Sequence, residues 1–532
     1  MTAEPTTLGE LVRAQSDRFG HAPFLFFGDR TLSFADLDDQ VERVARGLAE
    51  LGAGPGTGVA VLMPNSPEWL IAFFAVQRLG AYTVPVNVAL KGEGLRHVIG
   101  HSDAGILVTA AEYAEAVQAV TPGLPGLHRV VVDEQQASAD WRRPSGWIAL
   151  GELEGMAPGP ITRRTAVTGG ISTIMYTSGT TGAPKGVVSR YGGLNLSGMR
   201  MLAGGLQADD VLYTCLPLFH ANALLLTTAR ALAAGRPMAL ARRFSASRLW
   251  EDTRRYGVTT FNALGAMVPI LVKQPERPDD ADNPVRTVFS AACPASVWAE
   301  FERRFDVRII EGYAAVDGGG YMTINFGQSP PGSIGKAPGG WRIVDDDGRD
   351  VAVGETGELL FEVDDPTRRK VEYYKNEAAG SARIDGGWFR TGDLMRSDAE
   401  GNLYFVDRKT DSLRRRGENI SSWEVERELD RHPALLESAV FGVPSELGED
   451  EVMAVVVVKE GCQVTPEELV AFAEERMAAF MVPRFIEFRE SLPKTETHRT
   501  RKGELKRQGV GPATWDRQAS PSRADRGNPR AG

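Results

Sequence analysis

The sequence contains little cysteine. Cys215, Cys293 and Cys462 are its three cysteines, and no two of them form a CxxC pair. An odd set of widely spaced cysteines excludes a disulfide framework and a cysteine-based structural zinc site, and it is typical of a reduced, cytoplasmic protein. The first ten residues, MTAEPTTLGE, show neither a basic nor an apolar segment, so we expect no secretion signal.

An excess of positive charge and long apolar runs are also missing. The chain has 60 Lys and Arg against 70 Asp and Glu, for a net charge of −10. Binding to nucleic acid depends on a basic face that releases counterions, so nucleic acid is not expected as a partner. No apolar run reaches about 18 residues, and we therefore predict no membrane span. With 42% hydrophobic and 24% charged residues, the composition is that of a globular protein.

The N-terminal part alternates short apolar strands with helical patterns. Residues 58–63, GVAVLM, indicate a buried strand. Asn65 or Ser66 suits a helix N-cap and Pro67 suits the first helical turn, before a mostly apolar helix and a second strand at 81–87. This strand–helix–strand order predicts an α/β fold with large, mostly parallel sheets covered by helices.

Further along, the pattern changes twice. VRII at 307–310 and the turn-like VDDDG at 344–348 indicate antiparallel structure, which we expect as a small barrel-like region. After a polar segment, the chain predicts helix, two strands, helix and strand, which is a small α+β domain. We expect a large domain at 1–408, a small domain at 409–508, and a disordered tail at 509–532, where Pro, Gly, Ser and Arg dominate.

The strongest local motif is MYTSGTTGAPKGV at residues 175–187. Glycines allow backbone N–H groups to converge on an anion, hydroxyls add donors, and a lysine adds a point charge. The spacing differs from GxxxxGK[ST], so this is not the common P-loop. We interpret the segment as a phosphate-binding loop between a strand and a helix, formed by Thr177, Ser178, Gly179, Thr180, Thr181, Gly182 and Lys185.

Five motifs in order make this sequence similar to the adenylate-forming superfamily of acyl-CoA synthetases, peptide-synthetase adenylation domains and luciferases. Besides the loop, they are LPLFHANALL at 216–225, PGSIGKAPGG at 331–340, GWFRTGDL at 387–394 and the DRK…GENIS segment at 404–426. The resemblance, to the acyl-CoA ligase branch above all, implies ATP, Mg²⁺ and coenzyme A. A carboxylic acid would form acyl-AMP, and CoA would then displace AMP after the small domain, a mobile lid, rotates.

The resemblance also implies roles for individual residues. Asp393 and Arg408 would contact ribose hydroxyls, Asp317 would bind the metal, Thr410 would be the hinge, and Arg499, His220 and Lys185 would serve catalysis. Further nucleotide contacts would come from Ala292, Tyr313 and Val316, and CoA contacts from Arg416, Gly417, Glu418 and Asn419. The arginines at 414–416 suit CoA phosphates, but they also suit a solvated face.

Two departures from the family pattern affect the first half-reaction. Where the family has Tyr-Gly-x-Thr-Glu, this chain has Val316, which lacks a hydroxyl, and Asp317, whose carboxylate is about 1.5 Å closer to the backbone. Arg499 stands where the family has a lysine, and Lys502 is a candidate substitute. We hypothesise that adenylation is weak and that a partner ligase supplies acyl-AMP. The intact phosphate loop argues the other way.

Other functions stay open at this point. One alternative is an adenylating enzyme that loads a carrier protein, and the other is a non-catalytic scaffold that binds nucleotide. An amino-acid substrate is disfavoured, because residues 219–223 contain no acid to pair with an ammonium group. The GENIS segment is similar to carnitine/crotonobetaine ligases, and the departures are similar to ligases of platensimycin-type diterpenoid biosynthesis. The identity of the acid is not determined by these motifs.

Overall fold

The computed structural model describes most of the chain, and its contacts form two compact units. One unit contains Met1–Thr177 and Pro184–Lys409, and the other contains Thr410–Gly532. We call them the N-terminal and the C-terminal unit. The described residues are 5–155, 166–177, 184–192, 203–264, 267–291, 293, 295–314, 317, 322–345, 347–363, 371–408, 412–415, 418–445, 448–493, 500 and 502–519.

The N-terminal unit contains a sheet of seven described strands. Neighbouring strands are parallel except at the β8–β9 edge. The strand expected at 58–63 is present as β3, and its residues are fully buried, as two-sided coverage of a parallel sheet requires. In sheet order the strands are β7 (Ile148–Ala149), β6 (Arg129–Asp133), β5 (Ala104–Ala110), β3 (Gly58–Leu62), β4 (Tyr82–Pro85), β8 (Ile171–Thr177) and β9 (Lys185–Arg190).

A second sheet of the same unit has eight described strands. Its inner pairs are parallel, and only β14–β15 and β1–β2 are antiparallel. Together the two sheets confirm the expected α/β class with mostly parallel strands. In sheet order they are β15 (Met322–Asn325), β14 (Arg308–Ala314), β13 (Thr287–Ala291), β12 (Thr260–Leu264), β10 (Leu212–Thr214), β11 (Met238–Leu240), β1 (Pro23–Phe27) and β2 (Arg30–Ser33).

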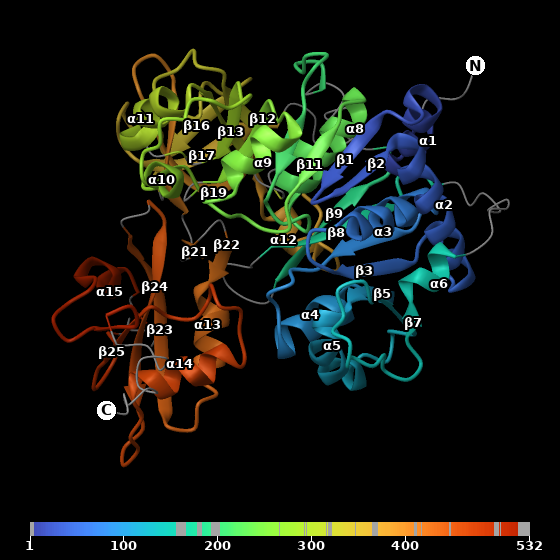
Figure 1. Cartoon of the computed structure of the whole chain (residues 1–532). Helices are drawn as coiled ribbons and strands as arrows, with labels where there is room; N and C mark the ends of the chain where they lie inside the picture. Colours follow the sequence, from blue (N-terminus) through green and yellow to red (C-terminus); the bar gives the residue numbers. More distant parts are fainter. Residues whose placement is uncertain are drawn as a thin grey trace, which may run out of the picture. The chain divides into compact units, whose positions relative to one another are not determined.

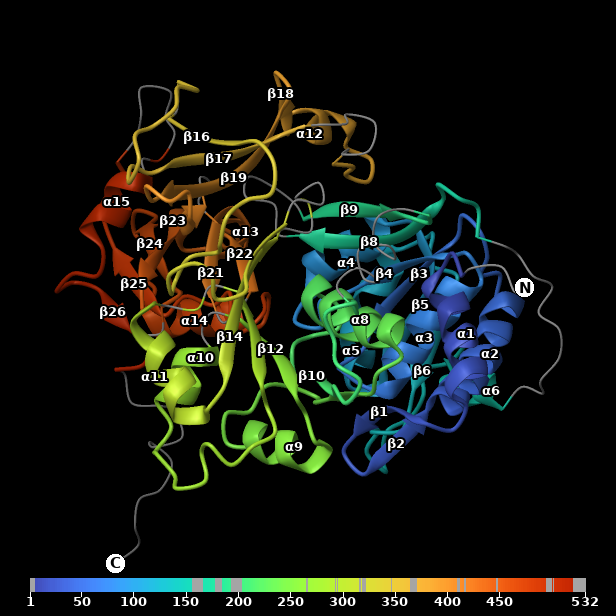
Figure 2. The same cartoon turned by 90° about the horizontal axis from the view of Figure 1, so that it is seen from above.

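Helices cover both faces of the seven-stranded sheet (Figures 1 and 2). The helix α3 (Pro67–Arg78) begins as expected: the Ser66 hydroxyl accepts a hydrogen bond from the Trp69 N–H, and Pro67 occupies the first turn. It is buried on nearly all sides, in one apolar core with α1 (Leu8–Phe19), α2 (Phe34–Glu50) and residues of both sheets. The opposite face packs on α4 (Gly92–His101) and α5 (Ala114–Val120).

The N-terminal unit contains further described helices. They are η1 (Ala111–Tyr113), η2 (Thr121–Gly123), α6 (Leu150–Glu154), the π-helix η3 (Asn222–Ala229), α8 (Arg230–Ala234), α9 (Leu249–Tyr256), α10 (Met267–Val272), α11 (Ala295–Phe305) and α12 (Glu377–Ser381).

One part of the expected antiparallel region is a sheet of five described strands in the same unit. The other segment, VRII at 307–310, instead lies mainly in β14 of the eight-stranded sheet, where it is parallel to β13. The turn predicted at 344–348 is present, with Val344 and Asp350 in bridge contact across it. The strands are β16 (Trp341–Val344), β17 (Gly357–Glu362), β19 (Trp388–Ser397) and β18 (Ile384–Asp385) in order, with β20 (Leu403–Arg408) also paired to β19. The long strand β19 therefore lies at the centre of the region and carries the GWFRTGDL motif.

The C-terminal unit is a small α+β structure, with helices and strands in the expected order. Thr465 caps α14 through a reciprocal capping box with Glu468. The elements are β21 (Ser412–Arg415), β22 (Glu418–Ser421), α13 (Ser422–Leu429), β23 (Leu435–Pro444), β24 (Asp450–Val458), α14 (Pro466–Glu474), β25 (Phe485–Phe488), α15 (Lys502–Gln508) and β26 (Trp515–Asp516). The main sheet has the order β23-β24-β25-β26.

The tail expected to be disordered from 509 onward is ordered up to residue 519, so that prediction is wrong for this part. Residues 515–516 form β26, antiparallel to β25. The Arg484 guanidinium donates to both carboxylate oxygens of Asp516 at 3.0 Å, and the Thr514 hydroxyl donates to Glu487 at 2.9 Å. Backbone pairing and these polar contacts, rather than apolar burial, hold the segment. Residues 520–532 lie outside the described residues.

Across the described ranges, no helix combines the length and apolar character that crossing a membrane requires.

Candidate active site

The two ends of the glycine- and hydroxyl-rich loop are held together by one hairpin. Thr177 ends β8, Lys185 begins β9, and the two are register partners. The lysine was expected to lead into a helix, and this expectation is wrong. The chain continues as strand β9 because it pairs with β8 on one side, while Gly186 accepts a hydrogen bond from the Tyr374 N–H at 2.7 Å on the other. The loop residues Ser178, Gly179, Thr180, Thr181 and Gly182 lie outside the described residues.

Two histidines of α4 contact the residues that flank this loop. His101 Nδ1 is 2.7 Å from the Tyr176 hydroxyl, and His97 Nε2 is 3.3 Å from the carbonyl oxygen of Pro184. The two imidazoles also stack, with 5.1 Å between their centroids. Burial lowers the pKa of His101, and the nearby His97 and Lys375 lower it further, against Asp103. These contacts position both ends of the predicted phosphate loop.

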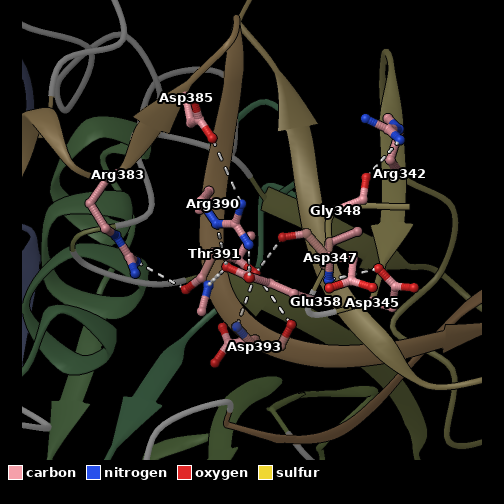
Figure 3. A network of polar contacts seen from close by, with 12 residues as sticks. Arg342, Asp345, Asp347, Gly348, Glu358, Arg383, Asp385, Arg390, Thr391 and Asp393 are labelled. Atoms are coloured by element: carbon pink, nitrogen blue, oxygen red, sulfur yellow. Dashed lines mark hydrogen bonds and ion pairs between the residues drawn. The ribbon is translucent and has the colours of Figure 1, made fainter. Parts of the chain in front are cut away.

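A second pair of predicted residues meets between β14, which carries Tyr313, and β19, which carries Asp393. The Tyr313 hydroxyl of β14 donates a hydrogen bond to Asp393 Oδ2 at 2.5 Å. Asp393 is buried on β19, and its backbone N–H donates to the Thr391 hydroxyl at 3.1 Å (Figure 3). Arg408 of β20 is the register partner of Asp393, although its side chain lies outside the described residues. The structure thus brings three residues predicted to contact nucleotide to one place.

The predicted metal ligand Asp317 contacts two residues that the motifs did not identify. Its Oδ2 accepts a hydrogen bond from the Tyr373 hydroxyl at 2.7 Å and lies 3.7 Å from Arg383 Nη2. Burial raises the pKa of Tyr373, and the carboxylate of Asp317 raises it further. The Lys185 ammonium lies 5.3 Å from the centre of the Tyr373 ring. Tyr373 therefore connects the lysine of the predicted phosphate loop to the predicted metal ligand.

One carboxylate limits the kind of metal site that is possible here. The described residues contain no group of three or more His, Cys, Asp or Glu side chains suited to a metal ion. Magnesium in nucleotide sites is commonly bound by one or two carboxylates together with phosphates and water. Asp317 fits a Mg²⁺ ion that is held mainly through the phosphates of ATP, and it does not fit a site built by the protein alone. Val316 and Ala292 lie outside the described residues.

His220 lies before an irregular helix. Its N–H donates to the Pro217 carbonyl at 3.0 Å, and its ring centroid is 4.5 Å from that of Phe219. The following helix, η3, has π-type hydrogen bonding, which is rare and is found frequently at functional sites. Within it, the Asn222 amide oxygen accepts a hydrogen bond from Asn262 at 2.7 Å. The role of His220 in an acyl pocket stays a prediction.

In the C-terminal unit, most of the predicted residues lie outside the described residues. This holds for Thr410, Arg416, Gly417 and Arg499, and for the side chain of Asn419. Glu418 begins β22 and is the register partner of Arg415, and it is partly buried. The predicted CoA contacts and the hinge thus stay predictions.

Two cations considered for ligand binding instead stabilise the C-terminal unit itself. The Lys502 ammonium is 2.7 Å from Glu426 Oε1 and 2.7 Å from the Ser422 hydroxyl. Arg415 is buried, donates to the carbonyl oxygens of Phe480 and Val482 at 2.9 and 3.0 Å, and lies 2.7 Å from Glu451. Lys502 is therefore no substitute for the family lysine in this arrangement, and Arg415 does not belong to a solvated face.

Sequence reasoning missed Tyr373, Arg383, His97 and His101. The pair of tyrosines in VEYYKN was a weak signal, because two adjacent aromatic residues in a polar segment seldom serve packing alone. No local signal marks Arg383, since the chain contains many arginines. The spacing of four between His97 and His101 places them on one face of a helix, but only the fold shows what that face contacts.

The described structure is of the α/β class, with mostly parallel sheets and an antiparallel sheet in one unit and a small α+β fold in the other. In the N-terminal unit, Tyr313 and Asp393, which the motifs predict to contact nucleotide, share a hydrogen bond. The chain belongs to the AMP-binding enzyme family, whose model matches residues 12–365, and the model of the AMP-binding enzyme C-terminal domain matches residues 424–499.

Known proteins resemble the chain over nearly its whole length. A medium/long-chain-fatty-acid–CoA ligase of Mycobacterium marinum is 33% identical over 498 residues, which cover 92% of this chain and 95% of the relative. A crotonobetaine/carnitine–CoA ligase of Salmonella paratyphi A is 30% identical over 491 residues, covering 90% and 93%. The structure of an o-succinylbenzoate CoA synthetase double mutant of Bacillus subtilis, bound to a product analogue, has a TM-score of 0.79 at 25% identity, covering 95% and 99%. None of these three supports the diterpenoid branch.

Proposed function

We propose that this chain is an AMP-forming acid–thiol ligase, an acyl-CoA synthetase that acts on a small-molecule carboxylic acid. One observation carries the proposal: contacts link the lysine of the phosphate loop to the buried aspartate of β19. They run from Lys185 over the Tyr373 ring to Asp317 and Arg383, and then to β19, where Asp393 meets Tyr313. The CoA ligases that resemble the chain over nine-tenths of its length support the same function.

The proposed reaction has two steps. A carboxylate oxygen of the acid attacks the α-phosphorus of ATP, the bond to the bridging oxygen breaks, and pyrophosphate leaves. The CoA thiolate then attacks the acyl carbon, the carbon–oxygen bond to the phosphate breaks, and AMP leaves. Mg²⁺ would neutralise phosphate charge in the first step. Because both steps develop charge on phosphoryl oxygens, positioned cations and donors provide most of the catalysis.

Individual residues take the roles that the family pattern implies. Lys185 and the loop from Thr177 to Gly182 bind the β- and γ-phosphates, and Tyr313, Asp393 and Arg408 bind adenosine. His220 lines the acyl pocket, and Arg499 supplies charge during adenylation. Thr410 is the hinge of the lid, and Arg416, Gly417, Glu418 and Asn419 contact CoA.

We further propose that adenylation is the weaker half-reaction and that acyl-AMP from a partner ligase is an alternative substrate. Three observations support this. Val316 has no hydroxyl, Arg499 replaces a lysine, and the Asp317 carboxylate already contacts Tyr373 and Arg383.

We place the protein in the cytoplasm, since its three cysteines are free thiols. Burial raises the pKa of Cys215 to about 12, which leaves that thiol unreactive.

Two assays on the purified protein test these proposals. The first supplies ATP, Mg²⁺, CoA and a panel of acids that includes fatty, betaine-type and aromatic carboxylates, and it measures pyrophosphate and acyl-CoA. The second supplies synthetic acyl-AMP with CoA. We expect acyl-CoA in both, with faster formation from acyl-AMP. Pyrophosphate release in the first assay as fast as acyl-CoA formation from acyl-AMP in the second would refute weak adenylation.

Two other outcomes would replace the main proposal. Acyl transfer to the phosphopantetheine of an added carrier protein, without acyl-CoA, would identify a carrier-loading enzyme. Binding of AMP without product from either assay would identify a non-catalytic nucleotide-binding scaffold.

A further inference from the structure

Arg383 is held in a short segment between α12 and β18. Its backbone N–H donates to the Gly380 carbonyl at 3.1 Å, and its own carbonyl accepts from the Arg390 N–H at 2.8 Å. The segment is therefore fixed by a helix end and by β19. From it the side chain extends across the Phe389 ring, with the guanidinium carbon 5.3 Å from the ring centre. Figure 3 shows the guanidinium directed toward Thr391.

The guanidinium has one well-formed hydrogen bond and unused capacity. Its Nη2 donates to the Thr391 carbonyl at 3.0 Å, while Asp317 Oδ2 lies 3.7 Å away, beyond hydrogen-bond distance. Its Nε is buried and has no hydrogen-bond partner among the described residues. Leaving a charged N–H unsatisfied is costly, and a guanidinium offers five donors in a planar fork. The side chain has donors to offer to an anion.

Space for the guanidinium is provided by Gly392. This residue has a φ of +70°, and a Cβ atom added to it would lie 3.0 Å from Arg383 Nη1. Gly392 directly precedes Asp393, the predicted ribose contact. The cation thus lies beside the backbone that presents Asp393, and it is within 4 Å of the predicted metal ligand.

We propose that Arg383 binds the phosphoryl group of the adenylate. The proposal depends on the nucleotide site described under the proposed function, because it places the phosphate between Asp393 and Asp317. Arg383 then supplies part of the positive charge that Mg²⁺ otherwise provides. It also supplies a hydrogen-bond donor in place of the hydroxyl that Val316 lacks. It also neutralises Asp317, whose negative charge would otherwise repel a phosphate. AMP and acyl-AMP are therefore bound without metal, and ATP binding depends less on Mg²⁺.

Calorimetric titration with AMP in the presence of EDTA tests the proposal. In Arg383→Met the unbranched side chain keeps the contact with Phe389 and loses the charge. A charge-assisted hydrogen bond to phosphate is worth about tenfold in affinity or more, so Arg383→Met is expected to bind AMP at least about tenfold more weakly. Arg383→Lys keeps the charge without the fork, and its affinity is expected to lie between those of the wild type and Arg383→Met.

Arg342→Met is the matched control. Arg342 lies on β16 of the same sheet, its guanidinium is 5.4 Å from the centre of the Trp388 ring, and its Nε is 2.7 Å from Asp350. Like Arg383, it contacts an aromatic ring and lies close to an aspartate, but it lies away from Asp393 (Figure 3). Thermal unfolding of every variant separates lost folding from lost binding.

Further titrations with ATP, with and without Mg²⁺, complete the experiment. Mg²⁺ is expected to increase ATP affinity more in Arg383→Met than in the wild type. AMP affinity of folded Arg383→Met within about twofold of the wild type, or an equal loss in Arg342→Met, would overturn the proposal. If the wild type forms acyl-CoA while Arg383→Met binds AMP normally, only this inference fails. If the wild type forms no acyl-CoA in either assay, the proposed function fails, while AMP binding still tests Arg383.

Discussion

Ion pairs of the C-terminal unit differ from the pair at the candidate site of the N-terminal unit in how closely the cation approaches the carboxylate. In the C-terminal unit, Lys502 lies 2.7 Å from Glu426, and Arg484 bonds both oxygens of Asp516 at 3.0 Å. At the candidate site of the N-terminal unit, the Arg383–Asp317 distance is 3.7 Å, and the carboxylate is bonded instead by a tyrosine hydroxyl.

This difference separates charges that stabilise the fold from charges that are available to a ligand. A closely paired, buried cation is expensive to unpair, so it contributes little to a site that must exchange ligands. A cation at 3.7 Å still offsets the charge of its neighbouring carboxylate, and it has donors to offer. Each of the following experiments tests one side of this comparison, beginning with the largest expected effect.

Lys502→Met should lower the free energy of unfolding of the C-terminal unit by about 2–3 kcal/mol, because it leaves the carboxylate of Glu426, whose side chain is only 14% exposed, without its cation. Burial already raises the pKa of Glu426. Urea denaturation with limited proteolysis measures the effect. Lys506→Met, at an exposed position of the same helix, should change stability by about 0.5 kcal/mol or less. If Lys502→Met were as stable as the wild type but released pyrophosphate more slowly, Lys502 would instead have a role in adenylation.

Asp393→Asn should weaken AMP binding about tenfold or more, which corresponds to about 1.5 kcal/mol, because an amide replaces a charged acceptor of hydroxyl hydrogen bonds. Calorimetry measures the affinity. Asp385→Asn, at an exposed position of the same sheet, is the control and should bind AMP like the wild type. Unchanged affinity in Asp393→Asn would show that this buried aspartate serves the fold alone.

Tyr373→Phe should reduce the Mg²⁺ concentration needed for half-maximal ATP binding by about fivefold, since the hydrogen bond from its hydroxyl to the Asp317 carboxylate is worth about 1 kcal/mol. Without that donor, the carboxylate becomes a stronger metal ligand. Tyr374→Phe removes the neighbouring hydroxyl, which donates to Asp103 at 2.8 Å, and should leave the Mg²⁺ dependence unchanged. The same shift in both variants would contradict the assignment of Asp317 to the metal.

The smallest effect concerns pH. The pKa of His101 is lowered in the folded protein by burial, His97 and Lys375. Above pH 6.5 the imidazole is neutral in both states. As the pH falls below 6.5, the unfolded chain binds the proton first, so stability is lost until the lower folded pKa is passed. As the pH is lowered from 7.5 to 5.5, the midpoint temperature of thermal unfolding should therefore fall less steeply in His101→Gln than in the wild type. His21→Gln, at an exposed position, should fall as steeply as the wild type.

Much of the fold and part of the site follow from local sequence. The strand at 58–63, the capped helix after Ser66 and the order of elements in the C-terminal unit depend on apolar periodicity and capping, which act within a few residues. The family pattern assigned Tyr313 and Asp393 separately to the nucleotide, but the hydrogen bond between them was not predicted. The end of the loop in a strand was not predictable, since Lys185 and Gly186 suit a helix start as well as a strand.

Sequence by itself determined the class of fold and the family, and it predicted the residues for nucleotide chemistry, because glycines, hydroxyls and charges at fixed spacing have a limited number of uses. Only the tertiary structure decided how individual charges are used. It placed Arg383 beside Asp317, buried Arg415 and paired Lys502 with Glu426, although all three cations look alike in the sequence. The physical reason is that the energy of a charge depends on its distance from other charges and on its burial, and residues far apart in the chain set both.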